Sequence, residues 1–130
     1  MFSPAVIGVV HAAGCTPNLE THICVSTNKT TYNPGEAVIA TVEETVPPDT
    51  PNVTASILIY PVPPPCNYLY LSCATAAGNV TLHPGPAEVW SGTVAVKLSD
   101  HVTAGNYEVT VFGTLPHGWA TSAAAGITVT

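Results

Sequence analysis

The chain has 130 residues, a formal net charge of −6 and only 8% charged residues, and Lys29 and Lys97 are its only basic side chains. Phosphate groups and anionic lipid headgroups are bound by clustered lysine and arginine, so this composition excludes nucleic acid and argues against anionic membranes as partners. A free monomer with so little charge is poorly soluble, which indicates a surface covered by neighbouring subunits, by sugar or by both.

The remaining composition predicts a single domain made only of strands and turns. Thirteen prolines and ten glycines occur among abundant threonine, valine and alanine. β-branched residues favour strands, and proline and glycine mark the turns between them. No segment has a helical period, and the alanine-rich run Thr121–Ala125 is too short to form a helix.

An uncharged stretch at the N-terminus, residues 2–14, is the most unusual segment of the chain. It is apolar at consecutive positions, so an extended backbone would present apolar side chains on both faces. Such a strand needs cover on both sides, either within its own domain or in a groove of another copy. We therefore divide the chain into a donor strand at 1–14 and a β-sandwich domain at 15–130, with Pro4, Ala5, Val6, Ile7, Val9 and Val10 as the donor residues. A secretory signal is not expected here, because no positive residue precedes the apolar run.

The four cysteines form two close pairs, Cys15 with Cys24 and Cys66 with Cys73. Sequence alone does not choose among the possible pairings, but local pairing is the simplest. Two disulfides predict an oxidising location, either extracellular or at the cell surface.

A metal site is the alternative explanation for the first cysteine pair. His11 precedes Cys15 and His22 precedes Cys24, so two histidines and two cysteines could meet. Neither spacing is the usual zinc pattern. The expectation is therefore two disulfides, with no metal and no other cofactor.

The rest of the chain reads as short strands separated by turn signals. Asn33, Pro34 and Gly35 form a turn, and residues 61–65 are a proline-rich loop because proline supplies no ladder donor. Alternating patterns predict strands at 22–27, 37–43, 52–60, 79–82, 90–98, 104–111 and 127–130. About six to eight such strands indicate an antiparallel β-sandwich.

Within these strands, alternate residues are expected to share a buried face. The predicted inward sets are Val38, Ala40 and Val42; Val53, Ala55, Ile57 and Ile59; Trp90, Gly92, Val94, Val96 and Leu98; and Tyr107, Val109 and Val111. Asn106, Glu108 and Thr110 are expected to point outward.

Two of these segments resemble known domains. Residues 30–38 (TTYNPGEAV) resemble the start of the second strand in prokaryotic surface immunoglobulin-like and macroglobulin-like domains, and residues 104–111 (AGNYEVTV) resemble their penultimate strand. In outline the chain is similar to subunits of archaeal extracellular filaments, the threads and bundling pili. The resemblance implies an immunoglobulin-like fold and a homopolymer joined by donor-strand complementation, with residues 2–13 as the donor.

Donor-strand joining is physically consistent with the sequence. A sandwich that lacks one strand exposes an apolar groove, which a neighbour's strand fills with main-chain hydrogen bonds and pocketed side chains. Each buried aliphatic side chain contributes about 1.5–3 kcal/mol. Donor and acceptor are different surfaces, so the contact is head-to-tail and propagates. The alternative is that the same stretch forms the first strand of its own domain.

Three Asn-x-Thr sequons, at Asn28, Asn52 and Asn79, predict N-linked glycans. Sugar at these positions would hydrate a surface that is poor in charge. The alternative is that they are ordinary polar turn residues.

No catalytic motif is present, so we expect neither an enzyme nor a small-molecule substrate. The acidic residues are scattered, and the histidines stand alone beside turn residues. The second functional hypothesis is a monomeric immunoglobulin-like binding module. Such a module could stack sugar on the aromatic side chains Trp90, Trp119, Tyr68 and Tyr70.

Overall fold

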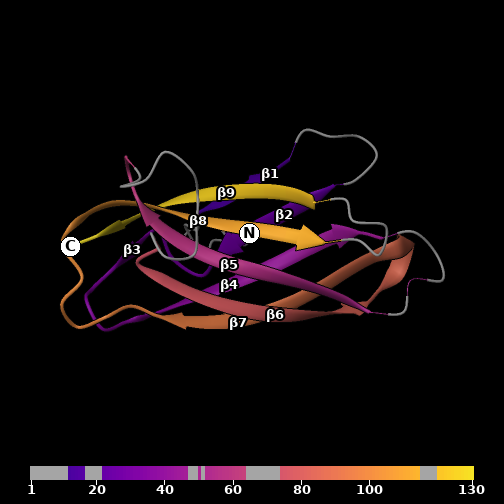
Figure 1. Ribbon diagram of the computed structural model, residues 1–130, viewed down its shortest axis with the longest axis horizontal. Coiled ribbons are helices and arrows are strands. Elements are labelled where there is room, and N and C mark those ends of the chain that lie inside the picture. Colours follow the sequence, from indigo (N-terminus) through magenta and orange to yellow (C-terminus); the bar gives the residue numbers. More distant parts are fainter. Residues whose placement is uncertain (1–11, 17–21, 47–49, 51, 64–73, 115–119) are drawn as a thin grey trace, which may run out of the picture.

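The computed structural model shown in Figure 1 describes residues 12–16, 22–46, 50, 52–63, 74–114 and 120–130. Outside the described residues lie the donor positions Pro4, Ala5, Val6, Ile7, Val9 and Val10, together with His11, Cys66, Tyr68, Tyr70, Cys73 and Trp119. Within the described part, no helix has the length and apolar character needed to cross a membrane.

The all-β prediction is confirmed. Within the described residues the strands are β1 (Ala13–Cys15), β2 (Ile23–Thr27), β3 (Thr31–Tyr32), β4 (Ala37–Thr45), β5 (Val53–Pro61), β6 (Ala76–Pro84), β7 (Val89–Lys97), β8 (Gly105–Thr114) and β9 (Ala120–Val129), and the 3-10 turn η2 (Pro86–Glu88) precedes β7. They form a single mixed sheet in the order β1-β2-β4-β7-β6-β5-β8-β9-β3. Every pair is antiparallel except β3 with β9.

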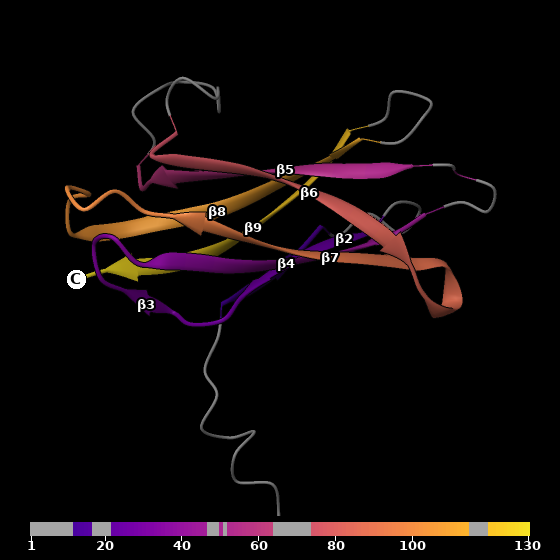
Figure 2. The same ribbon diagram turned by 90° about the horizontal axis from the view of Figure 1, so that it is seen from below.

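The sheet curls over itself, so that β5 and β6 lie across the molecule from β4 and β7 (Figure 2). Strand β6 joins the two halves, because it pairs with β5 over most of its length and with β7 through His83 and Pro84. The curl brings β2 into contact with β8 and β9. The strands are connected as one sheet, so the predicted β-sandwich of two separate sheets with immunoglobulin-like topology stays a prediction.

Strand alternation builds the core as the sequence indicates. The inward sets of β4, β5 and β8 are all buried, and they join one hydrophobic cluster with residues of β2, β6, β7 and β9. The predicted turn before β4 is confirmed: the Glu36 amide donates to the Asn33 carbonyl at 3.1 Å, and Gly35 has φ of 83°. Glycine adopts that positive φ without steric cost.

Several strands extend beyond the sequence-based predictions. Strand β6 extends beyond the predicted strand at 79–82 at both ends, and His83 and Pro84 belong to it because they pair with β7. Pro61 was assigned to a loop but is the last residue of β5, opposite Tyr107, where a strand terminus tolerates proline. The alanine-rich segment from Ala120 belongs to β9, because pairing with β8 satisfies its backbone.

One orientation was predicted wrongly. Thr110 was expected to face solvent, but its side chain is buried. It lies opposite Leu58 of β5, and Leu58 and the nearby Tyr60 are buried too. Both faces of this part of the sheet are therefore covered, so alternation alone assigns the wrong exposure.

Candidate functional site

The hydrogen bonds of the β1–β2 ribbon place two cysteines directly opposite each other. The Thr16 amide donates to the Ile23 carbonyl and the Thr27 amide to the Ala12 carbonyl, both at 2.9 Å. Cys15 and Cys24 therefore occupy a non-hydrogen-bonded pair, where facing Cα atoms approach most closely. Their Cα atoms are 4.0 Å apart and a disulfide joins them, which confirms the predicted local pairing.

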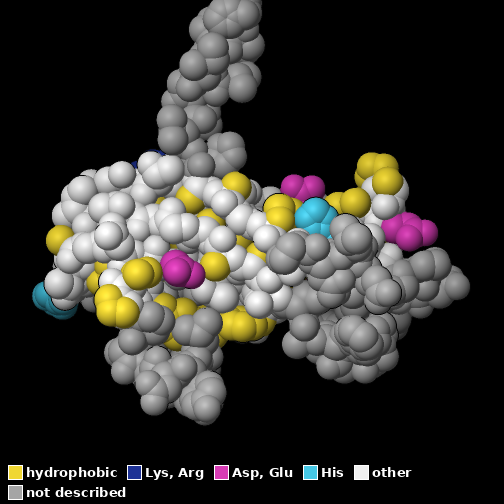
Figure 3. All heavy atoms as spheres, turned by 90° about the horizontal axis from the view of Figure 1, so that it is seen from above, with side chains coloured by type: hydrophobic (Ala, Val, Ile, Leu, Met, Phe, Trp, Pro, Cys, Tyr) yellow, Lys and Arg dark blue, Asp and Glu magenta, His cyan; other side chains and the backbone are white. Residues whose placement is uncertain are grey.

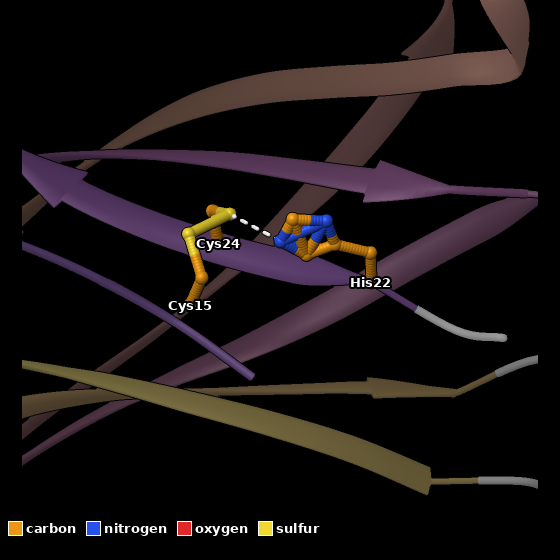
Figure 4. Close-up of a disulfide and its surroundings, with 3 residues drawn as sticks. All are labelled: Cys15, His22 and Cys24. Carbon is orange, nitrogen blue, oxygen red and sulfur yellow. Dashed lines mark hydrogen bonds between the residues drawn. A yellow bond between two sulfur atoms is a disulfide. The ribbon is translucent and has the colours of Figure 1, made fainter. Parts of the chain in front are cut away.

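His22 lies beside this disulfide (Figure 4). It precedes Cys24 by two residues, so the extended backbone directs both side chains to the same face. The His22 Nε2 atom is 3.3 Å from Cys24 Sγ, and the two sulfurs and one ring nitrogen all lie within 4.8 Å of one another. Cys15 and His22 are exposed and Cys24 is half-buried. The structure thus brings together the disulfide and His22, which are three of the four side chains of the metal-ligand hypothesis; the fourth, His11, lies outside the described residues.

Glu44 of β4 is a buried acid that the sequence reasoning overlooked. Its side chain is 1% exposed, and neither carboxylate oxygen has a hydrogen-bond partner within the described residues. Burial raises the pKa of this carboxyl from 4.5 to about 7. A signal was available, because position 44 continues the inward alternation of Val38, Ala40 and Val42.

Gly113 of β8 makes room for this carboxyl. A Cβ atom built on Gly113 would lie 2.5 Å from Glu44 Oε1 and 2.8 Å from Ile23 Cδ1. The buried acid therefore packs against glycine backbone at the contact between the two halves of the sheet. Glu44 and His22 also border a shallow hollow of about 170 Å³, together with Cys24, Glu43, Thr45 and Val89.

The two ends of the sheet meet without forming a ladder. Strand β1, at one end, contacts β9 near the other end. No backbone ladder joins these two strands within the described chain. We call this junction the β1–β9 seam, defined by β1 and by residues 120–127 of β9.

The register identifies the backbone groups of the seam that no ladder pairs within the described residues. The amides of Thr128 and Thr130 donate to carbonyls of the β3 segment, so even-numbered residues of β9 direct their backbone away from β8. Ser122, Ala124 and Gly126 continue this edge, and no ladder pairs them within the described residues.

Gly14 allows β1 to approach the seam closely. A Cβ atom on Gly14 would overlap the Ala124 carbonyl oxygen and would lie 2.8 Å from the Ala124 carbonyl carbon. Ala13 and Gly14 pair with Ser26 and Val25 of the same chain. These two residues were assigned to the donor segment 1–14, so a donated strand would comprise residues that precede them.

The β9 edge lacks the usual protection of an exposed strand. Natural edge strands carry charged residues, proline or bulges that prevent another chain from pairing with them. Strand β9 has neither charge nor proline from Ala120 to Val129. Figure 3 views the molecule from the side on which β1 and β9 lie in Figure 1, and charged side chains are few and scattered there.

All three sequon asparagines are exposed. Asn79 lies on β6 and Asn52 directly precedes β5, and both are on the outward face of the β5–β6 pair. The Asn79 Oδ1 atom accepts a hydrogen bond from Ser56 Oγ at 3.2 Å. Asn28 has a structural role as well, because its Oδ1 accepts hydrogen bonds from Tyr32 Oη at 2.6 Å and from the Ile39 amide at 3.2 Å.

Of the four aromatic residues considered for sugar stacking, only Trp90 lies within the described residues. Trp90 is half-buried and packs against the hydrophobic cluster. A separate, open hollow of about 500 Å³ lies where β5 ends and β8 begins, and both apolar and polar residues line it, among them Val62, His101, Val102 and Asn106.

Comparison with known proteins adds no assignment. No model of a protein family matches the chain, and no curated protein sequence matches it. Functional inference therefore depends on the β1–β9 seam, the sequence that precedes β1 and the cysteine–histidine cluster.

Proposed function

We propose that the chain is a structural subunit of an extracellular filament, which polymerises head-to-tail when the N-terminal strand of one subunit adds to the sheet of the next. The observation that supports this most directly is the β1–β9 seam: a long, uncharged strand edge next to the opposite end of the same sheet, with no ladder between them. An added strand would supply the missing hydrogen bonds.

The donor chemistry matches this acceptor. The aliphatic residues at 5–10 need cover on both faces when extended. Ser122 and Gly126 would offer their backbone groups to such a strand. At Ala124 the strand would displace Gly14 of β1, which packs against the Ala124 carbonyl. The donor stretch and the seam are different surfaces of one subunit, so repeated joining produces an open polymer.

Other features favour an extracellular setting. A disulfide between Cys15 and Cys24 is stable under oxidising conditions. Sugar on Asn52 and Asn79 would occupy the outward face of β5 and β6, with β8 between those strands and β9. Glycans at these positions would hydrate the polymer without covering the seam.

A charge placed on the β9 edge tests the acceptor. We expect Ala124→Lys to reduce filament formation at least about tenfold, because a penalty of about 1.4 kcal/mol per joint is sufficient for that factor. Ala95→Lys is the matched control: Ala95 is also exposed but lies on the interior strand β7. Negative-stain electron microscopy and light scattering measure the polymer. Equal loss in both variants, or in neither, would contradict the proposed acceptor.

Peptide complementation tests the donor and separates the filament from a monomeric binding module. A chain lacking residues 2–11 should remain monomeric, and a synthetic peptide of residues 2–11 should bind it and raise its Tm. The same peptide with Val6 and Ile7 replaced by aspartate should do neither. If the truncated chain is unfolded and the peptide has no effect, the segment belongs to its own core and the monomeric module is favoured.

Glycosylation at Asn28 is best tested through its threonine. Thr30→Ala removes the sequon and leaves the Asn28 hydrogen bonds in place, so we expect one glycan fewer by mass spectrometry and a Tm change of only a few degrees. Asn28→Gln should cost about 1–2 kcal/mol even in unglycosylated protein, because it disturbs the bonds to Tyr32 and Ile39. The same number of glycans on Thr30→Ala as on the wild type would show that this sequon is not used.

A further inference from the structure

We propose that the reduced chain binds one soft, closed-shell metal ion such as Zn²⁺ through Cys15, Cys24 and His22, so that the disulfide and the metal site are alternative states of one cluster. This inference is independent of the filament proposal.

The geometry of the three side chains supports the site. The two sulfurs and His22 Nε2 already lie within 4.8 Å of one another on one face of the β1–β2 ribbon. Tetrahedral zinc with Zn–S bonds of about 2.3 Å separates two thiolate sulfurs by roughly 3.8 Å. After the disulfide opens, rotation of the two cysteine side chains can bring the sulfurs to this separation, because the cysteines are directly opposed and their Cα atoms are 4.0 Å apart.

The ribbon would hold these ligands in place without the disulfide. Backbone hydrogen bonds on both sides of the cysteine pair, Thr27 to Ala12 and Thr16 to Ile23, fix the register of β1 on β2. Gly14, between them, packs on Ala124 of β9. The cysteines are therefore kept facing each other by contacts that reduction does not remove.

The donor set selects the kind of metal. Thiolate and imidazole ligands favour Zn²⁺ or Cu⁺ over Mg²⁺ and Ca²⁺, which prefer oxygen. Glu43 borders the same hollow as His22 and Cys24, and the chain carries a net charge of −6, so the local field attracts a cation. Three protein ligands leave the fourth position to water.

Reduction of the disulfide followed by metal binding converts one state into the other. A phosphine reductant attacks the disulfide, the S–S bond breaks, and water supplies the oxygen of the phosphine oxide and the protons of two thiols. Zinc then binds as both thiols lose their protons, while neutral His22 donates its Nε2 lone pair. Two protons are released for each metal ion, so binding should weaken at acid pH.

Zinc binding to the full-length chain tests the proposal. Phosphine-reduced protein under argon should bind one zinc ion per chain in calorimetry, about 100-fold or more tightly than the oxidised protein. Zinc should also raise the Tm of the reduced chain, because a ligand of the folded state stabilises it. Binding of equal strength by the oxidised protein, or no rise in Tm, would overturn the assignment.

Variants identify the ligands. His22→Gln leaves every cysteine in place and should weaken zinc binding at least about 10-fold. Loss of a residue that only orients a metal ligand already costs about that factor in affinity. His83→Gln is the matched control, since His83 is exposed on β6, away from the cluster. Cys66→Ser/Cys73→Ser should retain binding.

X-ray absorption of the reduced, zinc-loaded wild-type chain needs no substitution. It should show two sulfur and one imidazole nitrogen neighbours. A shell of four sulfurs, a shell without imidazole, or unchanged binding in His22→Gln would overturn the site.

Discussion

Replacing Glu44 with glutamine will make the protein more stable at pH 8 than the wild type, by about 3 kcal/mol, and will remove most of the fall in stability between pH 4.5 and pH 8. The wild-type carboxyl is buried with no hydrogen-bond partner in the described chain, and its pKa is raised from 4.5 to about 7. Glutamine has nearly the same shape and no charge to desolvate.

The direction follows from proton linkage. Below pH 4.5 the carboxyl is protonated in both the folded and the unfolded state. Between pH 4.5 and about 7 the unfolded chain has released the proton that the folded chain still holds, so the free energy of unfolding falls as pH rises. Above about 7 the folded state carries the buried charge as well, and this contribution to stability has been lost.

Urea unfolding of the wild type and of Glu44→Gln at pH 5, 6, 7 and 8 measures this effect. Glu43→Gln is the matched control, because the neighbouring acid is exposed and its replacement should leave the pH dependence in place. If Glu44→Gln followed the wild-type profile, another group would be responsible for the pH dependence.

Gly113→Ala should destabilise the protein less when Glu44 is also replaced by alanine, because the methyl group added at position 113 collides with the Glu44 carboxyl.

The second large effect is expected at the seam. Gly14→Ala should destabilise the protein by about 1–3 kcal/mol, the usual cost of overpacking, because the added methyl group has only backbone atoms of Ala124 in front of it. The disulfide holds the neighbouring Cys15 on β2, so the ribbon cannot simply release this residue. Ile23 and Val25 of β2, both fully buried, would shift with it.

Gly126→Ala is the control for this change. Gly126 is on β9 as well, but a Cβ atom there would meet nothing within 4 Å. Alanine at that position should be neutral or should stabilise the fold by up to about 1 kcal/mol through the lower entropy of the unfolded chain. Thermal unfolding of the two variants gives the comparison. A similar Tm for both would mean that β1 does not press on β9 in solution.

Period-two patterning was sufficient to predict much of the sheet. The inward faces of β4, β5 and β8 follow alternation in the sequence, and the turn before β4 follows from Asn33, Pro34 and Gly35. The local cysteine pairing was also predictable, because Cys15 and Cys24 are close enough in sequence to face each other across adjacent strands. These features depend on residues that are near one another in the chain.

The positions that were missed depend on contacts between distant segments. Thr110 looks solvent-facing in its own strand, but both faces of its part of the sheet are covered. The alanine-rich residues of β9 have low strand propensity, and they are extended because β8 provides a partner for their backbone. Glu44 lies at an inward position, but its burial depends on β2 and β8 closing over it.

By itself, then, the sequence determined an all-β chain, most strand faces, a turn and a local disulfide, because these follow from the pleat of a strand and the conformations that glycine and proline allow. Only the tertiary structure decided that the sheet curls until β1 meets β9, that Glu44 is enclosed, and that His22 stands beside the disulfide. Each of those outcomes depends on which strands become neighbours, and that is set by the packing of the whole core rather than by any single segment.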